Sequence, residues 1–375
     1  MEELRKRLAI VGGGAHTIPT YRALLKSFAE KYQIFLISEF YIDPKEHAKE
    51  YIIYSVSSQI KNRRWRELQF GLLVLKVCFK NRVSLIHSHS TYPSGFASVV
   101  TGSILRLPVV VSLDAAEATG ISDIGFGDLL HPKRRRVNQW VMNRATMLTV
   151  LTEFQRKEVQ GNLNLRREMC VIPRGINAQS IREQKRLLKS KPIQFLNVAY
   201  IHPVKDHNTL LKTFKTISQE IDSRLTLVGK DYESTRIQKL AKTLGIEHLV
   251  NFVGFVPHEN MQLYFNNADI LLHTSRYESQ ALVVVEAMAS GVLVCGTHVG
   301  LMADLSGQCC ITASIQDDSS LAQQVIDLIH DEQRQHQLRS AGLMWTQVHS
   351  LTWTTQQYFF LYDQLLGDSQ PGENR

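Results

Sequence analysis

The chain has 375 residues, of which 44% are hydrophobic and 21% are charged, and its formal net charge at pH 7 is +8. This length exceeds what one hydrophobic core usually organises, so two domains of about 180 residues each are expected. The composition excludes a fibre, a repeat array and a disordered chain, whereas the positive charge permits an anionic partner without identifying it.

Short apolar runs alternate with helical patterns along the first half of the chain. The expected strands are 8–11, 34–38, 85–87, 109–113, 147–151 and 171–173, separated by helical stretches such as 17–30 and 94–105. This alternation is typical of a parallel sheet with crossover helices. Residues 1–180 are therefore predicted to form one doubly wound, Rossmann-like α/β domain.

A polar, basic stretch over 174–191 interrupts this pattern, and a new series of apolar runs begins at Ile193. The second series of expected strands is 195–200, 225–228, 251–253, 270–273 and 292–295. It predicts a second Rossmann-like domain over 181–350, followed by a C-terminal helix and frayed tail over 351–375. Two such domains in tandem should face each other across a cleft, at the carboxyl ends of both sheets, where ligands usually bind.

Residues 61–82 carry seven basic side chains against one acidic side chain, so the segment has a net charge of +6. On a helix, its apolar side chains would form one stripe: Trp65, Leu68, Leu72, Leu75 and Phe79. Either the helix packs on its own sheet with a solvated basic face, or it docks on an anionic membrane surface. Nucleic-acid binding is disfavoured, because neither this segment nor the basic run 133–136 has a recognisable reading motif.

Five cysteines have neither zinc-ligand nor redox spacing and are interpreted as buried thiols in a reducing compartment: Cys78, Cys170, Cys295, Cys309 and Cys310. The N-terminus lacks a secretory h-region, and no apolar stretch reaches the ~18 residues of a membrane span. The expected location is the cytoplasm, with peripheral association at the inner face of the membrane. His87 and His89 have no further ligand cluster nearby, so no metal site is expected.

The strongest local signal is the segment 275–297, which follows a buried strand and opens a helix. The unpaired N–H groups at a helix start suit a diphosphate. A carboxylate ahead of the helix, Glu278, could bind sugar hydroxyls, and Glu286 could hold a diol. Eight helical residues would separate the two acids by roughly 12 Å, more than the ~5 to 9.5 Å of a glycosidase pair. The alternative is an ordinary loop acid followed by an acid favoured by the helix dipole.

This segment resembles the E-x7-E element of the retaining glycosyltransferases of family 4, which have the two-domain GT-B architecture. The segment 198–211 is similar to the strand, loop and helix that deliver the family's phosphate-binding lysine. Further matches lie at 227–229, at 253–257, which corresponds to the loop that holds the base, and at Gly296, Thr297 and Gly300; in the first half they lie at 11–14, 86–93 and 171–177. The resemblance covers nearly the whole chain and is closest from about 193 to 307. It implies that the domain 1–180 lies on the acceptor side and that the domain 181–350 binds the nucleotide-sugar donor.

The resemblance implies roles for the matched catalytic residues. Lys205 would neutralise the donor phosphates as charge builds on the leaving diphosphate, Glu278 would hydrogen-bond the transferred sugar, and Glu286 would bind the nucleotide ribose. Without the resemblance, Lys205 could be a solvated lysine at a helix start.

The same resemblance assigns the remaining donor contacts. They would come from the backbone N–H groups of Gln280, Ala281 and Leu282, from Pro257, and from Gly13 and Gly14. Glycine has no Cβ, so the last two positions would let the first-domain backbone approach the reacting centre closely. The glycine run could also be only a tight strand-to-helix turn.

Several positions depart from the family pattern. Tyr200 stands where an Arg is usual, so a second cation for the diphosphate is missing or comes from Arg174 or His202. Glu278-Ser-Gln-Ala281 replaces the commoner Glu-Gly-Phe-Gly. Asp114-Ala115 replaces a His-Gly pair, and Asp114 either contacts the acceptor or caps the local backbone. His16 is also assigned to the acceptor side.

The implied function is transfer of a sugar from a nucleotide-diphosphate sugar to a hydroxyl acceptor with retention of configuration, in cell-surface polysaccharide or glycolipid synthesis. The acceptor would be a saccharide or lipid-linked, and no metal or other cofactor is expected. Catalysis would rest on positioning and electrostatic stabilisation. The alternatives are a nucleotide-sugar epimerase or phosphorylase and a catalytically degenerate binding protein; a dehydrogenase is disfavoured because Thr17 replaces the third glycine of its fingerprint.

Overall fold

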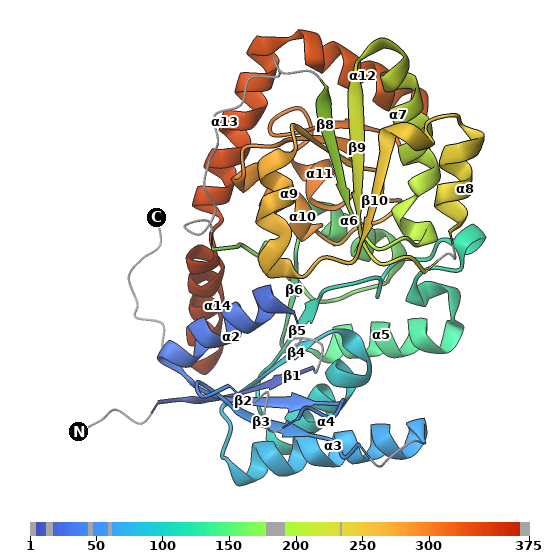
Figure 1. The fold of residues 1–375 in the computed structure, drawn as a ribbon. Coiled ribbons are helices and arrows are strands. Elements are labelled where there is room, and N and C mark those ends of the chain that lie inside the picture. Colours follow the sequence, from blue (N-terminus) through green and yellow to red (C-terminus); the bar gives the residue numbers. More distant parts are fainter. Residues whose placement is uncertain are drawn as a thin grey trace. The chain divides into compact units, whose positions relative to one another are not determined.

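The computed structural model describes residues 5–12, 18–43, 48–58, 62–177, 192–232 and 235–367. The chain forms two compact units, the first from Met1–Leu151, Arg156–Pro173 and Leu351–Arg375 and the second from Thr152–Gln155 and Arg174–Ser350. Each unit is built on one parallel sheet flanked by helices (Figure 1). The predicted fold class of two doubly wound, Rossmann-like α/β domains is confirmed.

The sheet of the first unit contains seven strands in the order β3-β2-β1-β4-β5-β6-β7. Their bounds are β1 (Arg7–Val11), β2 (Gln33–Ser38), β3 (Ile52–Ser55), β4 (Leu85–His89), β5 (Val109–Leu113), β6 (Met147–Val150) and β7 (Met169–Val171). The strand order reverses between β1 and β4, and ligands of doubly wound sheets bind outside the carboxyl ends at such a reversal. The edge strand β3 was not predicted.

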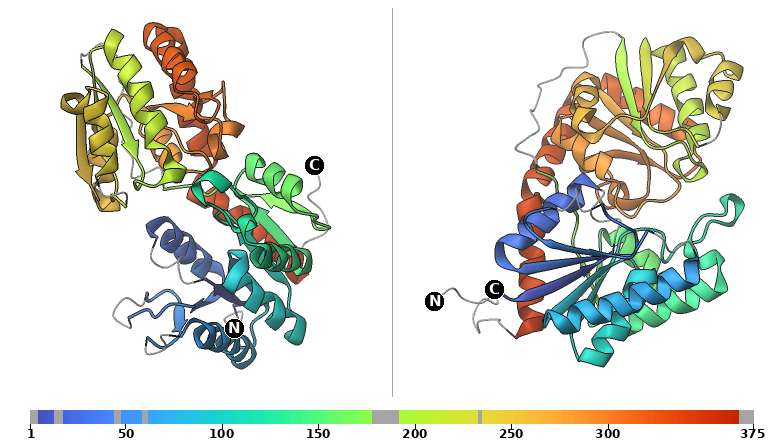
Figure 2. Two further views of the ribbon diagram at one scale, coloured as in Figure 1. Left: turned by 90° about the vertical axis from the view of Figure 1, so that its right-hand side faces the viewer. Right: turned by 60° about the horizontal axis from the view of Figure 1, so that its bottom comes forward.

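Alternate residues of these strands face two different helical layers. Ala9 and Val11 pack with α3 (Arg63–Lys80), α4 (Phe96–Leu105), α5 (Pro132–Arg144) and α6 (Glu153–Asn162). Leu8 and Ile10 pack instead with α2 (Pro19–Lys31) and α14 (Leu351–Leu366). The helix α14 was expected as a separate C-terminal element, but it lies beside α2 within the first unit (Figure 2).

The helix α3 buries a different face from the one predicted. Its buried residues are Phe70, Val74, Val77 and Cys78. Four residues of the predicted stripe are exposed instead, namely Trp65, Leu68, Leu72 and Phe79, and Leu75 is half-buried. The interpretation of this helix as packed on its sheet through that stripe is therefore wrong. The helix has two apolar faces, and the one that carries the two valines and the cysteine fits against the strands.

The sheet of the second unit has the order β10-β9-β8-β11-β12-β13. Its strands are β8 (Ile193–Val198), β9 (Ser223–Val228), β10 (Val250–Gly254), β11 (Ile270–His273), β12 (Leu293–Thr297) and β13 (Ile311–Ala313). The order reverses between β8 and β11, so the carboxyl ends of these two strands are where a ligand site is expected. The short edge strand β13 was not predicted.

Helices cover both faces of this second sheet. One face packs with α7 (His207–Glu220), α8 (Arg236–Thr243) and α12 (Asp318–His330). The other packs with α9 (Met261–Asn267), α10 (Leu282–Ala289) and α11 (Gly300–Asp304), and α13 (Glu332–Val348) lies against α10 and α12. The main segment of the second unit begins at Arg174, ahead of the predicted boundary at 180/181, which lies outside the described residues.

Candidate functional site

Two loops at the carboxyl ends of β8 and β11 are tied together in the second unit. The turn Pro203–Lys205 follows β8, and the loop 274–281 connects β11 to α10. The Arg276 N–H donates to the carbonyl oxygen of Val204 (2.7 Å). The Thr274 hydroxyl donates to the carbonyl oxygens of Lys205 (3.2 Å) and Asp206 (3.1 Å). These bonds hold the predicted lysine and the predicted glutamate in fixed positions relative to each other.

The Glu278 carboxylate lies at the centre of a compact polar cluster. Its Oε1 accepts from Lys205 Nζ (2.5 Å) and Ser275 Oγ (2.6 Å), and it lies 3.0 Å from His273 Nε2. Burial alone would raise the pKa of Glu278, but the Lys205 ammonium and the His273 ring hold it well below its ordinary value. The structure thus brings together both residues predicted as catalytic, and Glu278 is ionised there.

A glycine after β12 allows a close approach to this cluster. Gly300 has a φ of +53°, and a Cβ at this position would come within 2.8 Å of the Glu278 Cβ. The neighbouring Leu301 N–H donates to the Gln280 carbonyl oxygen (3.1 Å). Any larger residue at 300 would displace the loop that carries Glu278, which explains the glycine that the sequence places after Thr297.

The start of α10 offers backbone donors next to the cluster. In the part of the chain that the structure describes, the N–H groups of Gln280, Ala281 and Leu282 donate no hydrogen bond. The Gln280 side chain is not available to a ligand, because its amide bonds both the N–H and the carbonyl oxygen of Arg174 at 2.9 Å. Unpaired N–H groups at a helix start suit an anion.

The backbone ahead of α10 is not helical. Ala281 has φ +72° and ψ +82°, a conformation that glycine adopts more readily than alanine. The helix begins only at Leu282, so the separation of roughly 12 Å between Glu278 and Glu286, which assumed a continuous helix, does not apply. Although alanine replaces the glycine that is commoner in the family, the backbone at position 281 still adopts a left-handed conformation.

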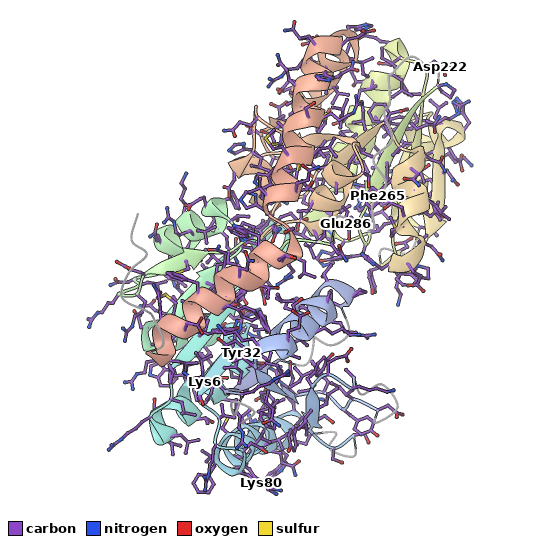
Figure 3. The ribbon with its side chains drawn as sticks, turned by 90° about the vertical axis from the view of Figure 1, so that its left-hand side faces the viewer. Lys6, Tyr32, Lys80, Asp222, Phe265 and Glu286 are labelled. Atoms are coloured by element: carbon purple, nitrogen blue, oxygen red, sulfur yellow. The ribbon has the colours of Figure 1, made fainter. Side chains whose placement is uncertain are left out.

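Glu286 lies on α10, one turn into the helix (Figure 3). Its Oε1 is 2.8 Å from His258 Nε2, and this hydrogen bond raises the pKa of His258. His258 directly follows Pro257, which caps the turn His258–Asn260. The two predicted donor positions, Glu286 and Pro257, are therefore neighbours. His258 was not predicted from the sequence as a site residue, although it directly follows the predicted donor residue Pro257.

A cavity of about 190 Å³ lies at the carboxyl ends of β8, β9 and β10, next to the lysine loop. His207 lines it, and within the described residues neither of its ring nitrogens has a hydrogen-bond partner. Burial lowers the pKa of His207 to about 4, so its ring is neutral at pH 7. The Gln238 side-chain oxygen, also on the cavity wall, lacks a partner in this same described part. Unpaired polar groups in a cavity are positions for water or for a polar ligand.

Tyr200 occupies the position where an arginine was expected. The Lys205 ammonium lies 5.3 Å from the centre of its ring, so Tyr200 offers its π-face to the cation rather than a second positive charge. His202 was one candidate for that second charge, but its Nδ1 accepts the Val204 N–H (3.2 Å). Lys205 is thus the cation that the structure places beside Glu278.

Asp114 follows β5 at the carboxyl edge of the first unit's sheet, where it contacts the side chains of His89 and Tyr21. Its Oδ2 lies 2.9 Å from His89 Nδ1 and also accepts the Tyr21 hydroxyl. The other ring nitrogen of His89, Nε2, is buried and has no partner among the described residues. The backbone that follows β5 is capped by Glu117, whose carboxylate accepts the N–H groups of Asp114 (3.4 Å) and Ala115 (2.9 Å).

Burial, aided by the nearby Asp114, raises the pKa of Glu117 to about 7. The first unit therefore has two adjacent acids, Asp114 and Glu117, at the carboxyl edge of its sheet, and Glu117 keeps a proton near neutral pH. The predicted donor residues Gly13 and Gly14 and the predicted acceptor residue His16 lie outside the described residues.

The described residues contain neither a metal-binding cluster nor a helix able to span a membrane. No group of three or more His, Cys, Asp or Glu side chains there could hold a metal ion. None of the described helices has the length and hydropathy that a membrane span requires. All five cysteines are free thiols.

Two family models match successive parts of the chain. Glycosyltransferase Family 4 matches residues 12–180, and Glycosyl transferases group 1 matches residues 179–345. N-acetyl-alpha-D-glucosaminyl L-malate synthase of Bacillus anthracis is 24% identical over 82% of this chain and 81% of its own length. Alpha-monoglucosyldiacylglycerol synthase of Acholeplasma laidlawii is 22% identical over 57% of this chain and 58% of its own.

Solved structures have the same fold. Anabaena HepE in complex with UDP and glucose superimposes with a TM-score of 0.74 at 19% identity, covering 96% of this chain and 100% of that one. The two family models match in the expected order and over most of the length, and this agrees with the two Rossmann-like units. The chain is a glycosyltransferase of group 1, a family with the GT-B fold.

Proposed function

We propose that this protein transfers a sugar from a nucleotide-diphosphate sugar to a hydroxyl acceptor, with retention of the anomeric configuration. The observation that carries the proposal is the buried Lys205–Glu278 pair beside the unpaired N–H groups that open α10. It combines a cation and backbone donors for a diphosphate with a carboxylate for sugar hydroxyls. Because HepE, which has the same fold, forms a complex with UDP and glucose, UDP-sugars are the first donors to test.

In this proposal each donor-side group has one task. The Lys205 ammonium and the N–H groups of Gln280, Ala281 and Leu282 stabilise the charge that develops on the departing diphosphate. Glu286 holds the ribose, with His258 orienting its carboxylate. No metal is required, because the lysine and the helix start supply the positive potential.

Retention is proposed to proceed without a covalent intermediate. The Glu278 carboxylate is a weak base and a weak nucleophile, because its Oε1 accepts from Lys205 and Ser275 and its pKa is lowered. It is therefore suited to positioning the sugar rather than to attacking it. The acceptor hydroxyl would attack the anomeric carbon from the face that the diphosphate leaves, and a departing phosphate oxygen would take the acceptor proton.

The acceptor side is proposed to include His89 and Asp114. Asp114 orients the His89 ring through Nδ1, and the buried, unpaired Nε2 is a hydrogen-bonding group that an acceptor hydroxyl could satisfy. The glycolipid synthase among the relatives favours a lipid-linked acceptor, and peripheral association at the cytoplasmic face of a membrane would bring the enzyme to it. The product would enter a glycolipid or a cell-surface polysaccharide.

The first test is calorimetric titration of the protein with UDP-, GDP- and ADP-sugars. One nucleotide sugar should bind, and Lys205→Ala and Glu286→Ala should each weaken binding by at least tenfold, as is typical of charge-assisted contacts. Lys212→Ala, which removes an exposed lysine of α7, is the matched control and should bind normally. Failure of every nucleotide sugar to bind would favour a degenerate binding protein instead.

Proton NMR of the reaction product supplies the second test. Retention requires the product's anomeric configuration to equal that of the donor. Conversion of the donor sugar in the absence of any acceptor would indicate an epimerase, and an inverted product would contradict the proposed mechanism.

A further inference from the structure

Large apolar side chains are exposed on three neighbouring helices of the first unit. On α3, Trp65, Leu68, Leu72 and Phe79 are between 54% and 73% exposed. On α4, the exposed residues recur every fourth position, as Phe96, Val100 and Ile104. Trp140 of α5 is also exposed. Apolar patches of this extent mark interaction sites more often than ordinary surface.

These side chains belong to one continuous surface, which we call the α3–α5 face. The helix α3 packs against α4, and α4 packs against α5, all on the same side of the sheet (Figure 2). The rings of Phe96 and Trp140 are 5.3 Å apart, which joins α4 to α5. Tyr92 joins α4 to α3, because its ring is 6.4 Å from Phe96 and its hydroxyl donates to Glu67 (2.7 Å).

The α3–α5 face is strongly positive. Its exposed basic residues are Arg63, Arg64, Lys76, Lys80, Arg106, Lys133, Arg135, Arg136 and Arg144. The sequences of α4 and α5 contain no acid, and the one acid of α3, Glu67, is paired with Arg63 at 2.8 Å. On α3 the apolar stripe is flanked by Arg64 on one side and by Lys76 and Lys80 on the other, and Lys80 lies at the end of the helix (Figure 3).

A hollow of about 500 Å³ opens beside Trp140 on α5. Three arginines line it, Arg136, Arg144 and Arg166, together with Asn143 and Gln139. None of these three guanidinium groups forms an ion pair with another described residue, and Arg144 lies over the Trp140 ring at 5.1 Å. Arginine groups converging without a carboxylate are suited to a phosphate.

We infer that the α3–α5 face docks flat on an anionic lipid bilayer, with its apolar side chains in the interface and a lipid phosphate in the arginine hollow. Apolar residues flanked by lysines and arginines, with tryptophan at the boundary, are what an interfacial surface requires. A second copy of the chain is disfavoured as the occupant, because pairing two such faces would bring their unpaired positive charges together. The inference rests on the proposed function only for the lipid acceptor, since docking itself requires no catalysis.

Cosedimentation of the full chain with lipid vesicles tests this surface. The probes are pure phosphatidylcholine vesicles and phosphatidylcholine vesicles with 30 to 40 mol% phosphatidylglycerol, roughly the anionic content at which surface charge attracts basic segments. The chain should bind the anionic vesicles, and raising the salt should weaken binding through screening. Two variants remove the two proposed components, Trp65→Ser/Leu72→Ser/Phe79→Ser and Arg136→Gln/Arg144→Gln/Arg166→Gln.

The apolar variant should lower partitioning at least about tenfold, because it removes three large side chains whose apolar surface the lipid would bury. The arginine variant should lower it about tenfold or more and reduce the preference for anionic lipid. The controls remove similar groups from the second unit, in Leu263→Ser/Met344→Ser/Val348→Ser and Lys212→Gln/Lys239→Gln/Lys242→Gln, and should bind vesicles normally.

Absence of binding to anionic vesicles, or equal losses in the control variants, would overturn the inference. Light scattering could show instead that the parent chain is a dimer and that the apolar variant alone is a monomer. That result would identify a second copy of the chain as the occupant and would also overturn the inference. Nucleotide-sugar titration of the same variants separates this result from the proposed function: they should bind the donor normally even where vesicle binding is lost.

Discussion

At the carboxyl edge of each sheet a histidine lies against a carboxylate, but the charges around the two pairs differ. In the second unit His273 lies 3.0 Å from Glu278, and in the first unit His89 lies 2.9 Å from Asp114. The third partner differs. Glu278 is joined by the ammonium of Lys205, whereas Asp114 has the buried acid Glu117 beside it.

The difference shows how the companion of a carboxylate decides its charge. The Lys205 cation keeps Glu278 ionised in spite of burial, while burial and Asp114 raise the pKa of Glu117 to about 7. One edge therefore presents an ion pair, and the other presents two neighbouring acids, of which Glu117 holds a proton up to about pH 7. This division suits the proposed donor site for an anionic diphosphate and the proposed acceptor site for a neutral hydroxyl.

Removing the cation is expected to have the largest effect. Lys205→Met should lower the rate of sugar transfer by about 10² to 10³, as expected for loss of one group that stabilises developing charge. It should also reduce the free energy of unfolding by about 3 kcal/mol, because it leaves Glu278 buried without a cation. Product formation and chemical denaturation are the two measurements.

The double variant Lys205→Met/Glu278→Gln is the control for this effect. It removes both charges, so it should recover most of the lost stability while remaining inactive. If the single variant were as stable and as active as the parent, the pair would be an ordinary surface salt bridge.

The acid pair of the first unit predicts an unusual pH dependence of stability. Glu117 binds its proton more tightly in the folded than in the unfolded chain, so its contribution is fully present below about pH 4.3 and is lost as pH rises through about 7. Glu117→Gln, which stays neutral, should abolish this loss. Between pH 4.5 and 7.5 its free energy of unfolding should fall about 3 kcal/mol less than that of the parent.

Urea denaturation at several pH values measures this difference. Glu30→Gln is the control, because it removes an exposed acid of α2 in the same unit. Parallel pH curves for Glu117→Gln and the parent would show that Glu117 is already ionised in the folded protein.

Glu286→Gln should weaken binding of the donor nucleotide by about tenfold, since a charge-assisted hydrogen bond to the ligand becomes a neutral one. The same variant should lower the pKa of His258, which the Glu286 carboxylate raises in the parent. Calorimetry measures the first effect and NMR titration of the His258 ring the second. A lower pKa with unchanged affinity would show that Glu286 serves only to hold His258.

The smallest expected effect concerns Ala281. Its left-handed backbone favours glycine, so Ala281→Gly should raise stability or leave it within about 1 kcal/mol, the balance between relieved strain and a more flexible unfolded chain. Ala281→Val should lower stability by more, since a β-branched residue tolerates this conformation poorly. Thermal denaturation of both variants checks the order, and greater stability of the valine variant would contradict it.

Local sequence patterns predicted most of the fold. Most central strands of both sheets are mainly apolar, as expected for strands buried on both faces, and they lie close to their predicted positions. The edge strands β3 and β13 were missed, because Ile52–Ser55 and Ile311–Ala313 are short and only partly buried. The resemblance to the family's motifs also predicted Lys205, Glu278, Glu286 and Pro257 as site residues, and the structure brings the first two into contact.

Other features depended on contacts between distant parts of the chain. Nothing in 351–375 indicated that α14 packs beside α2, because an amphipathic helix does not encode which sheet it covers. The same limit applies to α3, whose two apolar faces were distinguishable only once one of them met the strands.

The sequence by itself determined the two-unit α/β fold, because the fold follows from periodicity within short stretches, and its motifs predicted the donor-side residues. Tertiary structure alone decided the partners of those residues. It placed Lys205 against Glu278 across 73 positions, His258 against Glu286 across 28, and His89 against Asp114 across 25. A carboxylate's charge depends on which groups surround it in space, and local sequence carries no record of those groups.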